Sequence, residues 1–297
     1  GVVDPKAKTS SKGYKLAGIT EVDAYLPVGV LFDRGFPSYS YPVDIRRFHY
    51  DTVTMNNYLK FISTRIKHAP NSVQTLRAGT DNQLVMKRNG SSYPAFSIRN
   101  IKVNNLVWTG QGAGVRSILP DKIDAKDYNE NPLSIGIRIN YGNFDYFTGG
   151  DMTGISGYGL PEWFDVETHV AEATGEVDAL SLNHHGVRDA MNEFFLKTLQ
   201  PRVLVQQSWS SNHPGEEVLH RMINPFIWPG DRDIFATFVH PETLDTYGSW
   251  MKNNYKSLAG HIVIRVAPGG NEYRVYILDH HDASLPLVNT FGPYQSR

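Results

Sequence analysis

The chain has 297 residues, a formal net charge of −1 at pH 7 and no cysteine. The absence of cysteine excludes disulfides, thiolate metal sites and a cysteine nucleophile, so a metal would have to be held by His, Asp or Glu side chains. The balanced charge gives no sign of a nucleic-acid or membrane-surface partner through bulk electrostatics. We expect no membrane span, because no run of about 18 apolar residues occurs.

The first quarter of the chain consists of loops around one strand and one helix. Residues 1–18 are polar and predict a loop, and the apolar run at 29–33 predicts a short strand that ends in a turn. A segment rich in Pro and Tyr at 36–44 predicts a further loop. Over 51–67, apolar residues at helical spacing predict a helix.

The middle of the chain is rich in strands. From 73 to 108 the pattern predicts short strands in the segments SVQTLR, QLVMKR, FSIRNI and KVNNLVWT. Residues 109–133 are rich in Gly, Asp and Asn and predict a loop. The alternating segments at 134–142 and 144–150 predict a hairpin.

The second half alternates helices with strands. We expect helices near 161–174 and over 189–200, 214–223 and 243–257, and strands over 177–182, 203–208, 261–266 and 272–278. Asp189 is placed to cap the helix that follows it. Strands that alternate with helices after a strand-rich first half predict a layered α/β fold.

Asp151 closes the hairpin strand in the sequence YFTGGD. A carboxylate after a Gly-Gly turn at a strand tip suits an oxygen ligand that bridges two metals. The alternative is a turn aspartate that caps its own backbone.

The segment SLNHHGVRD contains His184 and His185, followed by Gly186. Adjacent residues on a strand point to opposite faces, so one histidine can face a site while the other packs or hydrogen-bonds behind it. The alternative is a pair of polar turn residues.

The segment SWSSNHP places His213 just before a helix N-terminus. Free backbone N–H groups and the helix dipole favour a phosphate or carboxylate there, and Ser211 and Asn212 are placed to donate hydrogen bonds to such an anion. The alternative is an exposed region in which Asn212 caps the helix.

These candidates follow one another at regular steps. Asp151, His184 and His213 each come after the carboxyl end of a predicted strand, 33 and 29 residues apart. Each step fits one strand–helix–strand unit, and layered α/β proteins collect their sites at these strand ends. We therefore expect the three residues to converge on one site.

A family resemblance rests on the same segments. The run from NPLSIGIRINYGNFDYFTGGD through VDALSLNHHGVRDAMNEFFLKTLQPRVLVQQS to NHPGEEVLHRM resembles the metallo-β-lactamase-fold hydrolases, and within them it looks like the competence-protein-like branch. VLFDRG at 30–35, and FAT at 235–237 followed by GHIVIRV, look like further stretches of that branch. The resemblance covers about residues 25–278 and is specific over 130–225.

The resemblance implies a four-layer αββα sandwich with a site for two metals, usually zinc, with manganese or iron as alternatives. In that family a bridging hydroxide attacks an ester or phosphodiester, so the implied substrate is a small molecule or a nucleotide phosphodiester. Asp151 would match the bridging, catalytic carboxylate. His184 would match a metal ligand, with His185 as its neighbour or alternative.

The same resemblance assigns the substrate side of the site. His213 would match the catalytic histidine that lies near the substrate. Beside it, Ser211 and Asn212 are expected as substrate contacts from their residue types and not from the resemblance. Asn131 stands where other branches place a metal-binding histidine, and we expect it to contact the substrate.

One departure from the family pattern leaves two functions open. The family's H-x-H-x-D-H cluster does not occur, and the first 48 residues contain no histidine. We therefore expect a single metallo-β-lactamase-like domain over 1–297 that is truncated at its N-terminus, with a polar C-terminal tail at 279–297. The first hypothesis is a metal-dependent hydrolase of an ester or phosphodiester. The alternative is an inactive module of the same fold that binds a phosphate-containing ligand or a protein partner.

Overall fold

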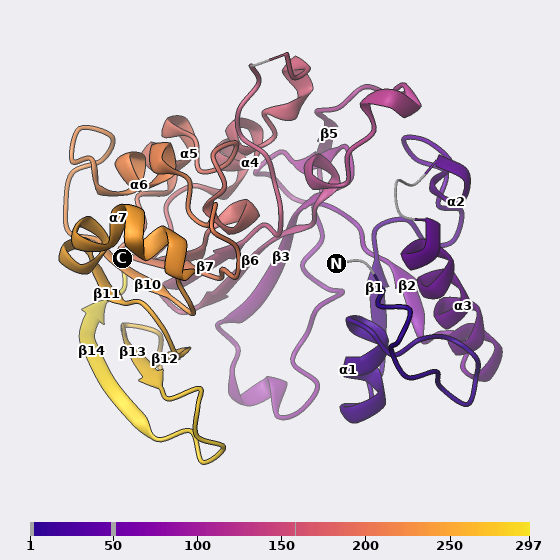
Figure 1. Ribbon diagram of the computed structural model, residues 1–297, viewed down its shortest axis with the longest axis horizontal. Helices are drawn as coiled ribbons and strands as arrows, with labels where there is room; N and C mark the ends of the chain where they lie inside the picture. Colours follow the sequence, from indigo (N-terminus) through magenta and orange to yellow (C-terminus); the bar gives the residue numbers. More distant parts are fainter. Residues whose placement is uncertain (1–2, 49–51, 158) are drawn as a thin grey trace. The chain divides into compact units, whose positions relative to one another are not determined.

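The computed structural model describes residues 3–48, 52–157 and 159–297 (Figure 1). The chain forms two compact units. The small unit comprises residues 1–77 and 120–129, and the large unit comprises residues 78–119 and 130–297. All the candidate site residues belong to the large unit.

Among its described residues, the small unit combines three helices with a pair of parallel strands. Its elements are α1 (Ile19–Tyr25), β1 (Leu31–Asp33), α2 (Ile45–Phe48), α3 (Thr52–His68) and β2 (Val73–Thr75), with a 3-10 turn at Ala125–Asp127. Its core is formed by Tyr14, Phe61, Ile62 and Val73. The strand predicted at 29–33 and the helix predicted at 51–67 are confirmed, although residue 51 lies outside the described residues.

Asp33 of the VLFDRG stretch has a structural role within the small unit. Its side chain is buried and accepts hydrogen bonds from the hydroxyls of Tyr39, at 2.9 Å, and Tyr58. It also accepts the backbone N–H of Gly35 at 2.6 Å. The carboxylate therefore holds the turn after β1 against α3.

The large unit is built on a mixed sheet of nine described strands, in the order β11-β10-β9-β8-β7-β6-β3-β4-β5. The strands are β3 (Phe96–Val103), β4 (Leu106–Trp108), β5 (Val115–Ser117), β6 (Gly136–Tyr141), β7 (Phe144–Thr148), β8 (Ala179–Ser181), β9 (Val203–Gln206), β10 (Asp233–Ala236) and β11 (Tyr255–Ser257). Pairing is parallel from β7 to β11 and antiparallel from β7 through β6 and β3 to β5. The parallel half matches the predicted alternation of strands and helices.

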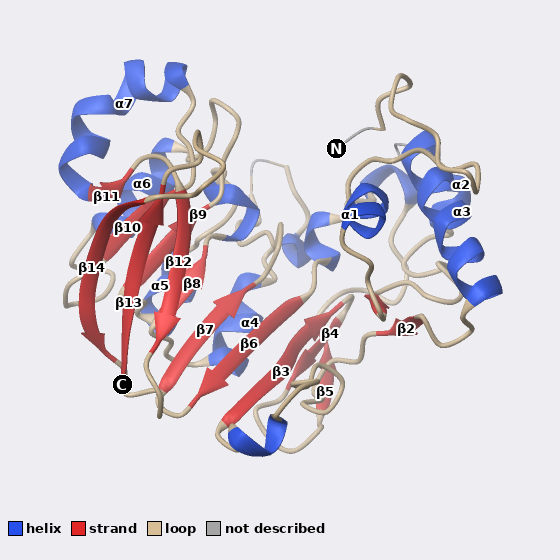
Figure 2. Cartoon of the chain, turned by 90° about the horizontal axis from the view of Figure 1, so that it is seen from below, coloured by secondary structure: helices blue, strands red, loops and turns tan. Residues whose placement is uncertain are grey.

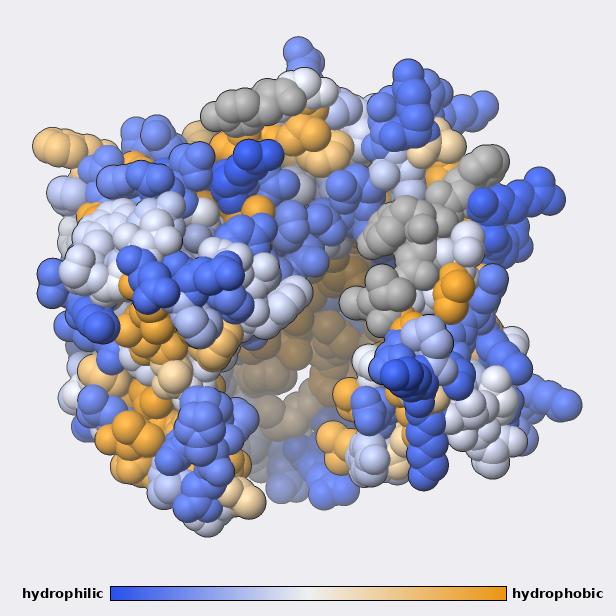
Figure 3. Space-filling view, viewed as in Figure 1, coloured by the Kyte–Doolittle hydropathy of each residue, from blue (hydrophilic) through white to orange (hydrophobic). Residues whose placement is uncertain are grey.

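A second sheet packs on one face of the large sheet (Figure 2). It contains the antiparallel strands β12 (His261–Val266), β13 (Glu272–Leu278) and β14 (Leu287–Gln295). Val203, Val205 and Phe235 of the large sheet meet Tyr273 and Val275 of the second sheet in a buried apolar layer. In the space-filling view, hydrophobic residues also show on the surface over this second sheet (Figure 3), where Leu287 and Val288 are exposed.

Helices cover the opposite face of the large sheet. The helices of this unit are α4 (Glu167–Thr174), α5 (Glu193–Leu199), α6 (Glu216–Ile223) and α7 (Pro241–Asn254). On β7, Tyr146 packs toward the second sheet, whereas the next residue, Phe147, contacts Phe195 of α5 with ring centroids 5.6 Å apart. This alternation puts the two layers on opposite faces of β7. The fold is thus mixed α/β and layered, and in the described ranges no helix is long and apolar enough to cross a membrane.

Several predicted elements differ from the structure. Residues 83–88 form bends and no strand, the loop predicted over 109–133 includes β5, and the helix predicted over 243–257 ends at Asn254, where β11 follows. Residues 287–295 of the expected polar tail form β14, which pairs with β13 through its backbone and buries Tyr294. Asp189 does not cap a helix: α5 begins at Glu193, and its cap is Asn192, whose side chain accepts the N–H of Phe195 at 2.7 Å.

Candidate functional site

The candidate residues lie at the carboxyl ends of three neighbouring parallel strands. Asp151 follows β7, His184 and His185 follow β8, and His213 lies between β9 and α6. The structure brings Asp151, His185 and His213 into direct contact, with the His185 and His213 rings stacked at a centroid distance of 4.8 Å. We call Asp151, His184, His185 and His213 the histidine cluster.

His185 lies between two groups that only accept hydrogen bonds. Its Nδ1 lies 2.8 Å from the backbone oxygen of Gln207, and its Nε2 lies 3.1 Å from Oδ1 of Asp151. A neutral imidazole has one donor and one acceptor nitrogen, so it can donate to only one of these two acceptors. When Nδ1 carries the proton, the Nε2 lone pair faces the carboxylate oxygen and a cation between the two atoms would satisfy both, whereas a ring with both protons would donate to both partners.

The spacing of this pair suits a metal ion. Two zinc bonds of roughly 2.05 Å that meet at a tetrahedral angle hold their ligand atoms roughly 3.3 Å apart. The Asp151 side chain is 44% exposed, so the pair is open to an ion from solvent. A hydrogen bond donated by His185, and the positive charges that His185, His184 and His213 carry when protonated, lower the pKa of Asp151 although burial opposes them. The carboxylate is therefore ionised and ready to bind a cation at neutral pH.

His184 is oriented by a carboxylate, as metal-binding histidines commonly are. Its Nδ1 lies 2.7 Å from Oδ1 of Asp189, and its Nε2 lies 3.0 Å from Nδ2 of Asn131. Burial alone would lower the pKa of His184, but the hydrogen bond and charge of Asp189, with the charge of Asp151, outweigh burial and raise it. Asp189, which the sequence suggested as a helix cap, thus positions the ring of His184.

His213 is a neutral imidazole at the edge of the cluster. Its side chain is buried, and burial together with the positive charges of His185 and His184 lowers its pKa to about 4. Its Nδ1 accepts the backbone N–H of Trp209 at 3.4 Å, so the proton of the neutral ring lies on Nε2. Trp209, whose side chain is 64% exposed, contacts both His185 and His213 edge to face and forms an aromatic rim.

The loop that carries the histidines is held in a strained conformation. His184 and His185 have φ values of 44° and 56°, which residues other than glycine rarely adopt. Backbone hydrogen bonds from His184 to Gly150 and from Gly215 to Gly186 fix the loop to neighbouring segments. Strain of this kind persists where the surroundings impose it and is concentrated at functional sites.

Glu167, at the start of α4, holds the same loop in place through buried hydrogen bonds. It is fully buried and accepts hydrogen bonds from the Asn183 amide at 2.7 Å and from the backbone N–H groups of Met191 and Asn192 at 2.8 and 2.7 Å. Sequence reasoning missed this residue. No sequence pattern points to it, and its closeness to Gly154, where an added Cβ would lie 1.9 Å from a Glu167 oxygen, is visible only in the structure.

The remaining candidates lie around the cluster. Ser211 and Asn212 are exposed in the turn before His213, and the Ser211 carbonyl accepts the Thr243 hydroxyl at 2.8 Å. Their contact with a substrate stays a prediction. Asn131 contacts the cluster directly, through its hydrogen bond to His184.

A complete metal site is not assembled by the residues that the structure describes, because no three His, Cys, Asp or Glu side chains among them are grouped to hold an ion. The donor atoms of Asp151 and His185 nevertheless fit two positions of a zinc site. Zinc takes about four ligands, so further ligands would be needed.

Comparisons with known proteins supply no family: no protein-family model matches this chain, and no curated protein matches it either. The function has to be argued from the groups of the site.

Proposed function

We propose that the large unit carries part of the metal site of a metal-dependent hydrolase that cleaves an ester or phosphodiester. The observation that carries the proposal is the pair formed by Nε2 of His185 and the Asp151 carboxylate, 3.1 Å apart and open to solvent. When the His185 proton lies on Nδ1, next to the Gln207 oxygen, two acceptors face each other unless a cation lies between them. The orientation of His184 by Asp189 supports the same reading.

Three residues of the cluster are candidates to hold the metal. Asp151 and His185 would hold the metal, with zinc as the first expectation and manganese or iron as alternatives. His184 would join them if the Asn131 amide moved away from its Nε2. A bound zinc would supply a Lewis acid and water of lowered pKa.

His213 would act on the substrate as a neutral donor. Because its Nδ1 accepts the Trp209 N–H, its Nε2–H is available to an oxygen of an ester or phosphodiester. Its low pKa keeps this arrangement constant at neutral pH. Ser211 and Asn212, exposed in the same turn, would add hydrogen bonds to that oxygen.

The test is a calorimetric zinc titration of the purified protein, of Asp151→Asn and of His185→Ala. We expect either substitution to weaken zinc binding at least about tenfold, since each removes one ligand. His281→Ala is the matched control, because His280 and His281 form an exposed histidine pair outside the cluster. Unchanged zinc affinity in both cluster variants would refute the proposal. Loss of bis(p-nitrophenyl) phosphate hydrolysis in Asp151→Asn would extend it to catalysis.

The second candidate function is a metal-free module that binds a phosphate-containing ligand. It is favoured by one observation, the hydrogen bond by which Asn131 already occupies Nε2 of His184. Inorganic phosphate binding that persists in a chelator and is lost in His213→Ala would favour this function over hydrolysis.

A further inference from the structure

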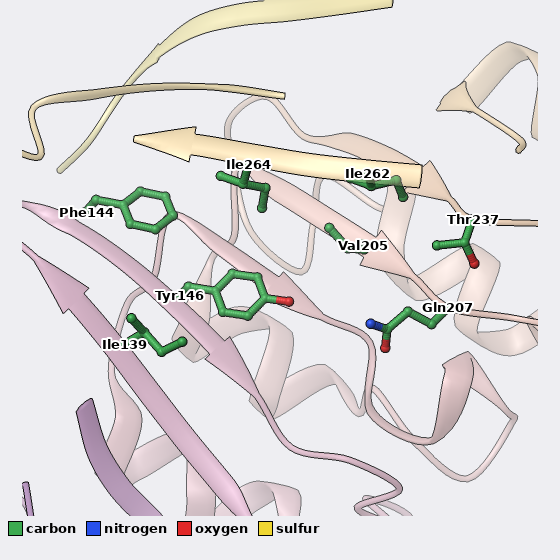
Figure 4. A pocket seen from close by; sticks show the side chains of 8 residues that line it. All are labelled: Ile139, Phe144, Tyr146, Val205, Gln207, Thr237, Ile262 and Ile264. Carbon is green, nitrogen blue, oxygen red and sulfur yellow. The ribbon is translucent and has the colours of Figure 1, made fainter. Parts of the chain in front are cut away.

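An apolar pocket lies between the two sheets of the large unit (Figure 4). Its volume is about 320 Å³. Its apolar lining consists of Ile139, Phe144, Tyr146, Val205, Ile262 and Ile264. These residues come from β6, β7, β9 and β12, and β12 is an edge strand of the second sheet. The pocket forms where the second sheet ends and leaves part of β6 and β7 uncovered.

The pocket has a polar end and an apolar end. Gln207 and Thr237 line one end, whereas Phe144 and Ile264 lie toward the other (Figure 4). The hydroxyl of Tyr146 points toward the polar end. Of the eight residues that line the pocket none is charged. Such a lining accepts an apolar group and rejects an ionised one, which would lose its water without gaining a partner.

The polar end is joined to the histidine cluster by one direct contact and one indirect one. The backbone oxygen of Gln207 lies 2.8 Å from Nδ1 of His185. The Tyr146 hydroxyl is hydrogen-bonded to Ser181, the last residue of β8, from which the chain enters the histidine loop. Gln207 therefore lies both at the histidine cluster, through its backbone, and at the polar end of the pocket, so the two sites adjoin at this residue.

We propose that this pocket binds the uncharged, apolar part of a small-molecule ligand whose ester group lies at the histidine cluster. The ligand is thus an ester with an aliphatic or aromatic substituent. The position of the ester rests on the proposed function, but filling the pocket does not require a metal. A concave, largely apolar site with a few polar groups at one end is the usual form of a small-molecule site.

The first experiment is a fluorescence titration with the neutral apolar probe N-phenylnaphthylamine. We expect saturable binding to one site and at least about tenfold weaker binding to Ile264→Lys, which puts a charge into the pocket. Val263→Lys is the matched control on the same strand. Val263 is 42% exposed and, one residue along β12, points away from the pocket. We expect this variant to bind like the wild type.

The proposal would be overturned if the probe showed no saturable binding, or if both lysine variants lost probe affinity equally. It would also be overturned if the protein sedimented as a dimer that the probe dissociates, because a second copy would then cover the pocket. With zinc added, a series of p-nitrophenyl alkanoates should show KM falling with chain length in the wild type and not in Ile264→Lys. Probe binding without zinc binding would refute the proposed metal site and support the pocket as an apolar binding site. Zinc binding without probe binding would support the metal site and refute the pocket proposal.

Discussion

Glu167 is a fully buried carboxylate that holds the chain on both sides of the histidines, so its removal gives a sharp prediction. The carboxylate is the acceptor for three donors, the side chain of Asn183 and the backbone N–H groups of Met191 and Asn192. Glu167→Ala leaves these donors without that acceptor. At about 1 kcal/mol or more for each unsatisfied buried donor, the loss is roughly 3 kcal/mol. This is a large part of the 5–15 kcal/mol, roughly, that stabilises a typical protein.

Glu167→Gln removes the titrating carboxyl group and keeps nearly the same side-chain shape. Burial raises the pKa of Glu167 to about 7 from 4.5, although its three hydrogen bonds oppose the rise. A raised carboxyl pKa means that the folded state holds the proton more tightly than the unfolded state. The stabilisation is therefore complete below pH 4.5 and is lost as the pH rises to about 7. A shift of this size corresponds to about 3 kcal/mol.

The assay is urea unfolding at four pH values between about 5 and 8. This range covers most of the pH interval over which the stabilisation is lost. We expect the free energy of unfolding of the wild type to fall with pH relative to Glu167→Gln, by up to about 3 kcal/mol. Glu162→Gln is the control, because Glu162 is exposed and should leave the wild-type slope unchanged. Parallel curves for the wild type and Glu167→Gln would refute the reasoning. Gly154→Ala, whose Cβ would strike Glu167, should destabilise the protein independently.

Further predictions concern the cap and the other titrating groups. Asn192→Ala should cost about 1–2 kcal/mol of unfolding free energy in urea, because it removes the cap of α5. Asp189→Asn should instead lower the pKa of His184, measured by NMR titration, and an unchanged pKa would contradict the assigned contact. His213 should titrate near pH 4, so the stability linked to it is present above pH 6.5 and is lost as the pH falls to about 4. A midpoint near 6.5 would show that its ring is not buried beside two histidines.

The sequence predicted elements whose signal is local. Four such elements have a hydrophobic period of their own: the helix at 51–67, the hairpin around residue 143 and the strands at 261–266 and 272–278. They appear with the predicted ends or with small shifts of them. The order of Asp151, His184 and His213 at successive strand ends also predicted their proximity, because parallel strands bring these ends together.

The errors occur where a distant contact decides the outcome. Residues 83–88 have a mixed apolar pattern, but a strand needs a partner, and Val85 stays exposed. β14 shows no alternation of apolar and polar residues, since Leu287 and Val288 are both exposed, and it forms through backbone pairing to β13. Asp189 satisfies the local rule for a helix cap, yet its carboxylate binds His184 instead. Glu167 looked like any surface glutamate, since nothing local reports the three donors that meet it.

The left-handed backbone at His184 and His185 has a consequence for selection experiments. A left-handed residue other than glycine costs about 1–2 kcal/mol, and glycine adopts the same φ freely. In a saturation library sorted for thermal tolerance alone, glycine should therefore accumulate at both positions. A library sorted for zinc retention should keep histidine at position 185 at least. If the two sorts diverge there, the imidazoles occupy these positions, with φ of 44° and 56°, at the expense of stability.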